Sequence, residues 1–133
     1  MSSFSEFVVQ GGQSITAGQV DSFRGHLAAY KLKAELLKTE RQPLLADQCA
    51  FLLRYIEDVL DDAYVPGDFH ALPEAIFAVR YLVKGVDIIP DNLPGGYTDD
   101  AAVLREVLIG HEPEFREFSA ESKIDFDALQ VGE

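Results

Sequence analysis

Apolar residues recur at steps of three and four along most of the chain, a spacing that predicts amphipathic helices. A first helix is expected to begin after Thr16, because Thr16 and Gln19 fit a capping box. One apolar stripe then continues to residue 37; its members are Val20, Phe23, Leu27, Tyr30, Ala34 and Leu37. We expect this stripe to be buried in the domain's own core, with Gly25 weakening the helix only a little.

Proline and glycine indicate the bounds of three further helices. Pro43 suits the first turn of a second helix, and Pro66 with Gly67 ends it. Pro73 begins a third, which is so rich in apolar residues that we expect it to be central. A fourth should span about residues 98–109. Since no stretch alternates like a strand, the sequence predicts an all-α, single-domain bundle of about four helices.

Both ends of the chain lack a sustained period. Residues 1–15 carry apolar side chains ahead of Gly11 and Gly12 and are expected to form an N-terminal arm. A helical domain of residues 16–120 should follow it. Residues 121–133 form an acidic C-terminal tail, which is either frayed or docked. The apolar residues that could dock it are Ile124, Phe126 and Leu129.

Charge divides the chain into two unequal parts. The formal net charge is -12. Residues 1–56 hold five acids and six bases, whereas residues 57–133 hold 18 acids and five bases. Such a negative surface repels nucleic acids and anionic membranes, and favours a protein partner. No apolar run is long enough for a membrane span, and the first residues lack the features of a secretory signal, so we expect a cytoplasmic protein.

The segment from Gly85 to Asp100 is the most informative one, because two prolines and three glycines make its path specific. Its short blocks, with one that precedes it, are Tyr81-Leu82, Asp87-Ile88-Ile89-Pro90-Asp91, Leu93-Pro94, Gly96-Tyr97 and Asp99-Asp100. Together they resemble the signature of the YkvA-like bacterial domains, a family of unknown function, over about residues 76–108. The resemblance implies a helical hairpin around an Asp-rich turn and brings no established activity.

Four carboxylates of this segment are candidate metal ligands: Asp87, Asp91, Asp99 and Asp100. Mg²⁺ and Ca²⁺ prefer hard oxygen ligands, so either ion is the cofactor that this group would bind. The alternative is structural, since acids at the start of a helix offset its dipole and accept hydrogen bonds from backbone amides. The EF-hand pattern itself is absent.

A second acidic cluster, Glu57, Asp58, Asp61 and Asp62, falls at the end of the second predicted helix. Like charges one turn apart repel, and acids near a helix C-terminus oppose its dipole, so the cluster requires compensation. Arg80 and Lys84 are candidate partners, and a cation shared with the Asp87 segment is another. The cluster could also be a solvated face, and we regard it as a candidate interaction surface.

The remaining reactive residues give little support for catalysis. Cys49 lies among apolar residues at helical spacing and is expected in the core. His26, His70 and His111 form no zinc motif and are expected at the surface or at helix caps, and no nucleophile or nucleotide-binding motif is present. We therefore expect a non-catalytic domain that binds another protein. A divalent-cation-binding domain is the alternative, and a metal-dependent hydrolase with Glu57 or His70 as base is the third; whether the chain is a homo-oligomer stays open.

Overall fold

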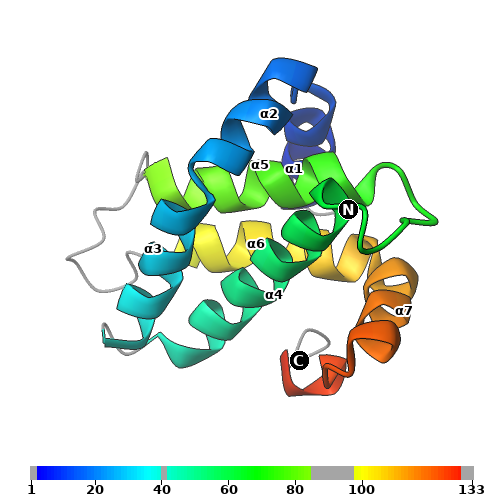
Figure 1. Cartoon of the computed structure of the whole chain (residues 1–133). Helices are drawn as coiled ribbons and strands as arrows, with labels where there is room; N and C mark the ends of the chain where they lie inside the picture. The colour runs from blue at the N-terminus through cyan, green and yellow to red at the C-terminus, as the bar shows by residue number, and fades with distance from the viewer. Residues whose placement is uncertain (1–2, 40–41, 85–97, 130–133) are drawn as a thin grey trace.

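The computed structural model describes residues 3–39, 42–84 and 98–129, which form a helical bundle (Figure 1). The elements are α1 (Ser3–Gln13), α2 (Ala17–Gly25), α3 (Leu27–Thr39), α4 (Pro43–Leu60), α5 (Ala71–Lys84), α6 (Thr98–Gly110), α7 (Glu112–Ser122) and a short 3₁₀ helix, η1 (Phe126–Leu129). No strand occurs among the described residues, so the all-α prediction is confirmed. None of the described helices has both the length and the apolar composition needed to cross a bilayer.

The expected number of helices, about four, is wrong, because the described residues contain seven α-helices. One reason lies at His26, whose amide donates to the Phe23 carbonyl and turns the chain between α2 and α3. Gly25, directly before this corner, thus marks the end of a helix rather than a weak point inside one. The predicted capping box is confirmed, since the Gln19 amide donates to Thr16 Oγ1 at 3.1 Å and the Thr16 amide to Gln19 Oε1 at 2.8 Å.

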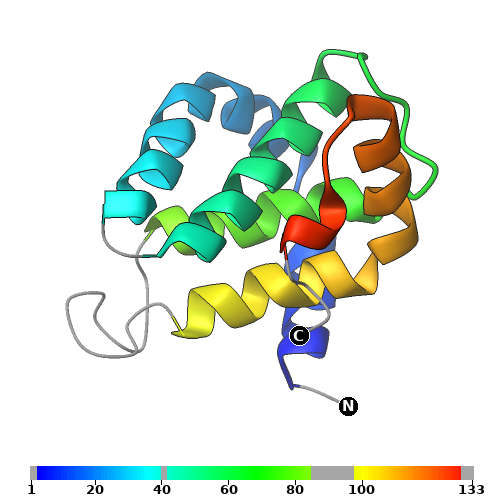
Figure 2. The same ribbon diagram turned by 90° about the horizontal axis from the view of Figure 1, so that it is seen from below.

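α5 lies in the middle of the bundle, as its apolar density predicted. It packs against α1, α4 and α6, and Figures 1 and 2 show α4 and α6 beside it. Its fully buried residues are Ala71, Ala75, Ile76, Ala78, Val79 and Leu82. The three alanines in this group keep the helix thin, which lets its neighbours approach closely.

The first residues of the described chain form a helix that packs on the bundle. α1 crosses α5 and α6, with Val8 buried and the Phe7 ring edge-on to Phe77 at 5.2 Å. Gly11 and Gly12, which the sequence placed at the end of an arm, lie inside α1 where it meets α5. A Cβ atom at Gly12 would come within 2.4 Å of Glu74 Cγ and 3.3 Å of the Glu74 backbone nitrogen.

The C-terminal segment is docked over its described part. Phe126 and Leu129 of η1 are each only 5% exposed, and the buried Gln48 side chain donates to the Leu129 carbonyl at 2.9 Å. Phe126 packs against Phe51 of α4, and the Arg116 guanidinium lies over its ring. The tail was expected to be either frayed or docked, and residues 124–129 are docked.

The close approach of α1 to α5 predicts opposite effects for two glycine-to-alanine substitutions. Gly12→Ala should lower the free energy of unfolding by about 1–2 kcal/mol, because overpacking against the Glu74 Cγ and the adjacent backbone outweighs the gain in helix propensity. Gly18→Ala in α2 is the matched control, since its Cβ would meet only Thr16 Oγ1 at 3.9 Å. We expect it to stabilise the protein by about 0.5–1 kcal/mol in urea denaturation. Equal effects would contradict the tight crossing.

Candidate functional site

The predicted carboxylate site lies largely outside the described residues. Asp87 and Asp91 are not among them, and Asp99 and Asp100 are the second and third residues of α6, with side chains that are likewise not described. Acids in the first turn of a helix offset its dipole, so the position of Asp99 and Asp100 fits the alternative that they stabilise the helix start. Within the described part of the chain, no three ligand-type side chains gather as a metal site would require. The binding of Mg²⁺ or Ca²⁺ stays a prediction.

Two acids of the second cluster pair with cations beside the groove between α3 and α4. Glu57 Oε2 lies 3.0 Å from the Lys31 ammonium of α3. Asp58 Oδ2 lies 2.9 Å from Arg54 Nε, one turn earlier on α4. Because both cations are half exposed, each pair stabilises the fold by about 0–1 kcal/mol at most.

Arg24 compensates the C-terminal end of α4. From α2, its guanidinium donates to Asp61 Oδ1 at 2.6 Å and to the Leu60 carbonyl. A cation here offsets the helix dipole and satisfies a carbonyl that the helix itself leaves open. The sequence predicted Arg80 and Lys84 of α5 as the partners of this acidic cluster. In the described ion pairs the cations are instead Arg24 of α2, Lys31 of α3 and Arg54 of α4. Lys84 lies at the far end of α5, about 20 Å along its axis from Ala71.

Asp62 has a local structural role. Its φ of 59° is left-handed, and it follows Asp61, the C-cap residue of α4. Its amide donates to the Val59 carbonyl, and that of Ala63 donates to the Asp58 carbonyl at 2.8 Å, which is a Schellman motif. The motif turns the chain out of α4 into the loop of residues 61–70.

This loop between α4 and α5 exposes two large apolar side chains. Val65 is 82% exposed and Phe69 is 80% exposed, the two highest values among the large apolar residues described as exposed. The acids Asp61, Asp62 and Asp68 lie in the same loop. Sequence reasoning took residues 66 and 67 only as a helix end, although an aromatic residue in a Pro-Gly-Asp loop was visible as a signal.

A buried carboxylate holds the middle of the loop. Glu114 of α7 is 5% exposed; its Oε1 accepts the Gly67 amide at 3.1 Å and its Oε2 accepts the Tyr55 hydroxyl at 2.7 Å. Burial raises the pKa of Tyr55, and the hydrogen bond to the Glu114 carboxylate raises it further, so the hydroxyl stays a donor. A buried carboxylate without such donors would be strongly destabilising, so the loop and Glu114 depend on each other.

His111, at the junction of α6 and α7, holds the end of the loop. Its Nδ1 lies 2.6 Å from Asp68 Oδ2 and its Nε2 lies 3.0 Å from Glu74 Oε1. Both ring nitrogens can donate at once only in the protonated imidazolium. We name this arrangement the His111 clamp. His111 is the N-cap residue of α7, as the capping alternative expected, but its side chain makes no cap hydrogen bond. The His111 and Glu74 side chains are each only 11% exposed, so this histidine does not lie at the surface.

The pKa shifts in the clamp follow from these contacts. The hydrogen bond to Glu74 is the largest influence on His111 and raises its pKa; burial opposes this, and the bond to Asp68 adds to it. Burial disfavours the ionised form of Asp68, but hydrogen bonds from the His70 amide and from His111 outweigh it, so the pKa of Asp68 is lowered. Both shifts favour the form of the clamp in which a protonated His111 lies beside an ionised Asp68.

The clamp borders an open cavity of about 630 Å³. Its other walls come from α1, α5 and α6, and include Val9, Gly12, Ile15 and Pro73. Since both nitrogens of His111 are engaged by carboxylates, this ring has none free to accept a proton from a substrate. His70 also lines the cavity and is exposed. The geometry of the clamp thus suits the holding of a loop better than general base catalysis.

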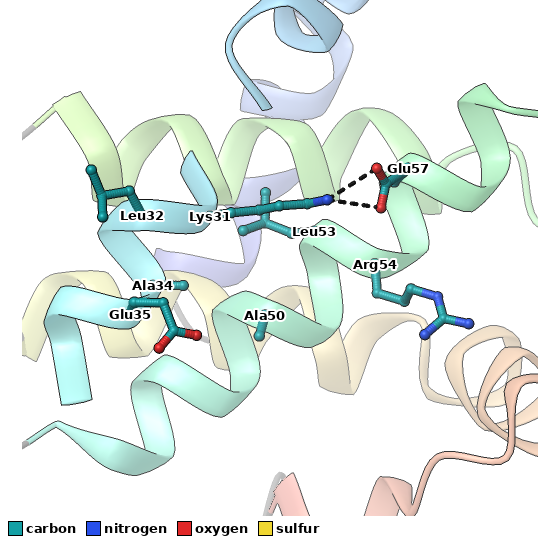
Figure 3. A pocket seen from close by; sticks show the side chains of 8 residues that line it. All are labelled: Lys31, Leu32, Ala34, Glu35, Ala50, Leu53, Arg54 and Glu57. Carbon is teal, nitrogen blue, oxygen red and sulfur yellow. Dashed lines mark hydrogen bonds and ion pairs between the residues drawn. The ribbon is translucent and has the colours of Figure 1, made fainter. Parts of the chain in front are cut away.

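A second concave surface lies between α3 and α4 (Figure 3). The cavity measures about 370 Å³, and its apolar lining comes from Leu32, Ala34, Ala50 and Leu53. Figure 3 shows the Lys31 ammonium reaching across the groove to the Glu57 carboxylate. We call this surface the α3–α4 groove. Its charged side chains comprise two cations and two anions, Lys31, Arg54, Glu35 and Glu57.

The clamp predicts that stability falls as the pH rises above neutrality. The folded-state pKa of His111 lies above the ordinary value of 6.5, so its contribution is complete below about pH 6.5 and is lost as the pH rises through the raised pKa. The Asp68 contribution has the opposite sign, being complete above pH 3.8 and lost as the pH falls below that. Urea denaturation between about pH 2 and pH 9 measures both effects.

His111→Gln should remove most of the decline above pH 6.5 and destabilise the protein at pH 6 by about 1–3 kcal/mol, because a neutral amide replaces the charged donor between Asp68 and Glu74. His26→Gln, at the exposed corner between α2 and α3, is the control and should retain the wild-type pH dependence. An NMR titration that puts the pKa of His111 at or below 6.5 would show that the ring does not hold both carboxylates.

Comparison with known proteins gives one match. Neither a curated protein nor a solved structure matches the chain. The matched segment holds nearly all of α5 and the first half of α6, which pack side by side as the implied helical hairpin requires. Residues 72–104 match the model of the family described as "Protein of unknown function (DUF1232)", which confirms the resemblance over this segment, a quarter of the chain.

Proposed function

We propose that this protein is a non-catalytic domain that binds a basic partner protein through the loop of residues 61–70. The observation that carries the proposal is the pair Val65 and Phe69, each at least 80% exposed on a loop whose backbone is held in place. Single exposed apolar residues are common, but two so fully exposed on one anchored loop are available for contact with a partner.

The anchoring of the loop lowers the entropic cost of binding. The Gly67 amide donates a hydrogen bond to Glu114, and Asp68 is hydrogen-bonded to His111. The start of the loop is fixed by the backbone hydrogen bonds of the Schellman motif at the end of α4. A preorganised loop loses little freedom when it binds, so more of the gain from apolar burial appears as affinity. Complete burial of one Phe or Val side chain is favourable by about 1.5–3 kcal/mol.

The charges around the loop indicate a basic partner. Asp62 belongs to the loop itself, as do Asp61 and Asp68, which are paired with Arg24 and His111. Burial, together with the charges of Glu114, Glu117 and Glu121, raises the pKa of Tyr64 to about 12, so acids of α7 lie close to the same loop. Complementary charge accelerates association and selects among partners, and added salt weakens this electrostatic attraction. Of the four acids that the sequence proposed for an interaction, Asp61 and Asp62 border this surface, and Glu57 and Asp58 lie nearer the α3–α4 groove.

Site-specific photo-crosslinking in the host cell tests the proposal. A photoreactive phenylalanine analogue at position 69 should crosslink to one main protein with a basic surface, and the same analogue at the exposed Ala128 of η1 should not. Once that protein is purified, Phe69→Ser should weaken binding about 30-fold, as expected for a central apolar contact. Asp62→Asn should slow association and reduce its dependence on salt.

Two results would contradict this function. One is crosslinking at position 69 that does not exceed crosslinking at position 128. The other is a partner whose affinity is the same for wild type and Phe69→Ser. Circular dichroism of each variant checks the fold, which should be retained because Phe69 makes little contribution to the core.

A further inference from the structure

The Asp68 carboxylate connects the His111 clamp to the exposed Phe69. Its Oδ2 lies 2.6 Å from His111 Nδ1, and its Oδ1 accepts the His70 amide at 2.9 Å. The second of these bonds closes an Asx turn whose middle residue is Phe69. The Ala71 amide also donates to the Asp68 carbonyl at 3.3 Å, so the turn leads directly into α5. The backbone that presents the Phe69 ring therefore depends on a side chain that His111 holds.

The charged groups around His111 set its protonation state. Those of the neighbouring elements are Asp68 and His70 of the loop, Tyr55 of α4, Glu74 of α5, and Glu112, Glu114 and Arg116 of α7. Of these, Asp68 and Glu74 pair with the ring nitrogens, whereas Glu112 pairs with Arg116. The walls that α1 and α6 give to the adjoining cavity add no charged side chain among the residues described there. Asp68 and Glu74 are therefore the groups that respond first when His111 changes its charge.

Loss of a proton from the ring leaves one of the two carboxylates without a donor. A neutral imidazole carries a single N–H, which can donate to Glu74 or to Asp68 but not to both. The Glu74 side chain is 11% exposed, whereas that of Asp68 is 35% exposed. Because an unsatisfied carboxylate is less favourable where it is buried, the remaining proton stays on Nε2, beside Glu74. The Nδ1 lone pair then faces the Asp68 carboxylate, and repulsion turns this side chain toward water.

We propose that the protonation state of His111 regulates the loop of residues 61–70, in that the protonated ring holds the Asx turn closed around Phe69 and the turn loosens when the Nδ1 proton passes to solvent. The other anchor of the loop, the bond from the Gly67 amide to Glu114, does not involve His111, so the change is confined to residues 68–70. Its effect on binding rests on the proposed function, because Phe69 is the residue assigned to the partner. A partner that requires the closed turn binds less tightly when only part of the population is closed.

The direction of the pH dependence follows from the contacts of the ring. The hydrogen bond to Glu74 raises the pKa of His111, burial opposes this, and the bond to Asp68 adds to it. The turn is therefore closed below about pH 6.5 and loosens as the pH rises through the raised pKa. The pKa of Asp68 is lowered, so this carboxylate stays ionised throughout that range.

Single-tryptophan variants test the turn without a partner. The chain contains no tryptophan, so Phe69→Trp places a sole fluorescent reporter at an exposed position. Time-resolved fluorescence anisotropy should show the amplitude of its fast local motion rising about twofold between about pH 5.5 and pH 9, with a midpoint at the pKa of His111 measured by NMR. Val65→Trp is the matched control, since Val65 is 82% exposed in the same loop but lies outside the turn. Its local motion should not change with pH.

Two histidine variants assign the titrating group. His111→Gln in the Phe69→Trp background should abolish the transition, whereas His70→Gln should retain it, because only the His70 backbone amide takes part in the turn. Fast motion at position 69 that is constant across the pH range overturns the proposal, and so does an equal change at positions 65 and 69. The comparison of these two positions needs no histidine variant, so it decides the matter even where His111→Gln is too unstable to measure.

A binding measurement separates this regulation from the proposed function. With the protein that crosslinks at position 69 in hand, the Kd should rise about fivefold between about pH 6 and pH 8.5 for the wild type, and by less than about twofold for His111→Gln. Equal rises for the two proteins would overturn the regulation of binding and leave the proposed function intact. Failure of crosslinking at position 69 would instead overturn the function, while the tryptophan variants still decide whether His111 controls the turn.

Discussion

A buried carboxylate is tolerated only when hydrogen-bond donors surround it, and in this bundle the donors come from segments that are distant in sequence. Glu114 accepts hydrogen bonds from the Tyr55 hydroxyl of α4 and from the Gly67 amide, and Glu74 pairs with His111. These contacts join the loop after α4 to the corner between α6 and α7, two places that are about 45 residues apart in sequence. None of these groups is satisfied unless the helices have already packed, so the polar contacts follow from the apolar core and then make the loop specific.

The core that permits this is built around α5. Small residues on α5 and a pair of glycines on α1 let these two helices approach closely at Glu74. The Glu74 carboxylate contacts His111. On the other side, aromatic rings of α4 and α7 pack edge to face around Phe51, with Phe126 of the docked C-terminal segment. Edge-to-face packing fills space without polar partners and leaves the buried Tyr55 hydroxyl directed at Glu114.

Exposed apolar residues occur in both parts of the chain, in different charged surroundings. The acid-rich part carries the anchored loop with Val65 and Phe69, the surface that we propose for a basic partner. The nearly neutral part carries Leu32 and Leu36 on the outer side of α3, where the charged side chains of the neighbouring groove are balanced.

The sequence by itself determined the fold class, the capping of α2, the starts of α4 and α6, the central place of α5 and the family signature. These features depend on local spacing and on the backbone preferences of Thr16, Pro43 and Gly110, which act within a few residues. It did not predict the corner at His26, the packing of α1, or the role of His111. The corner at His26 is a local turn across which the apolar stripe continues. The packing of α1 and the role of His111 depend on contacts between distant residues, Gly12 with Glu74 and His111 with Asp68. Only the tertiary structure decides them, because a side chain's burial and charge partners are set by helices that meet in space and not by its neighbours in the chain.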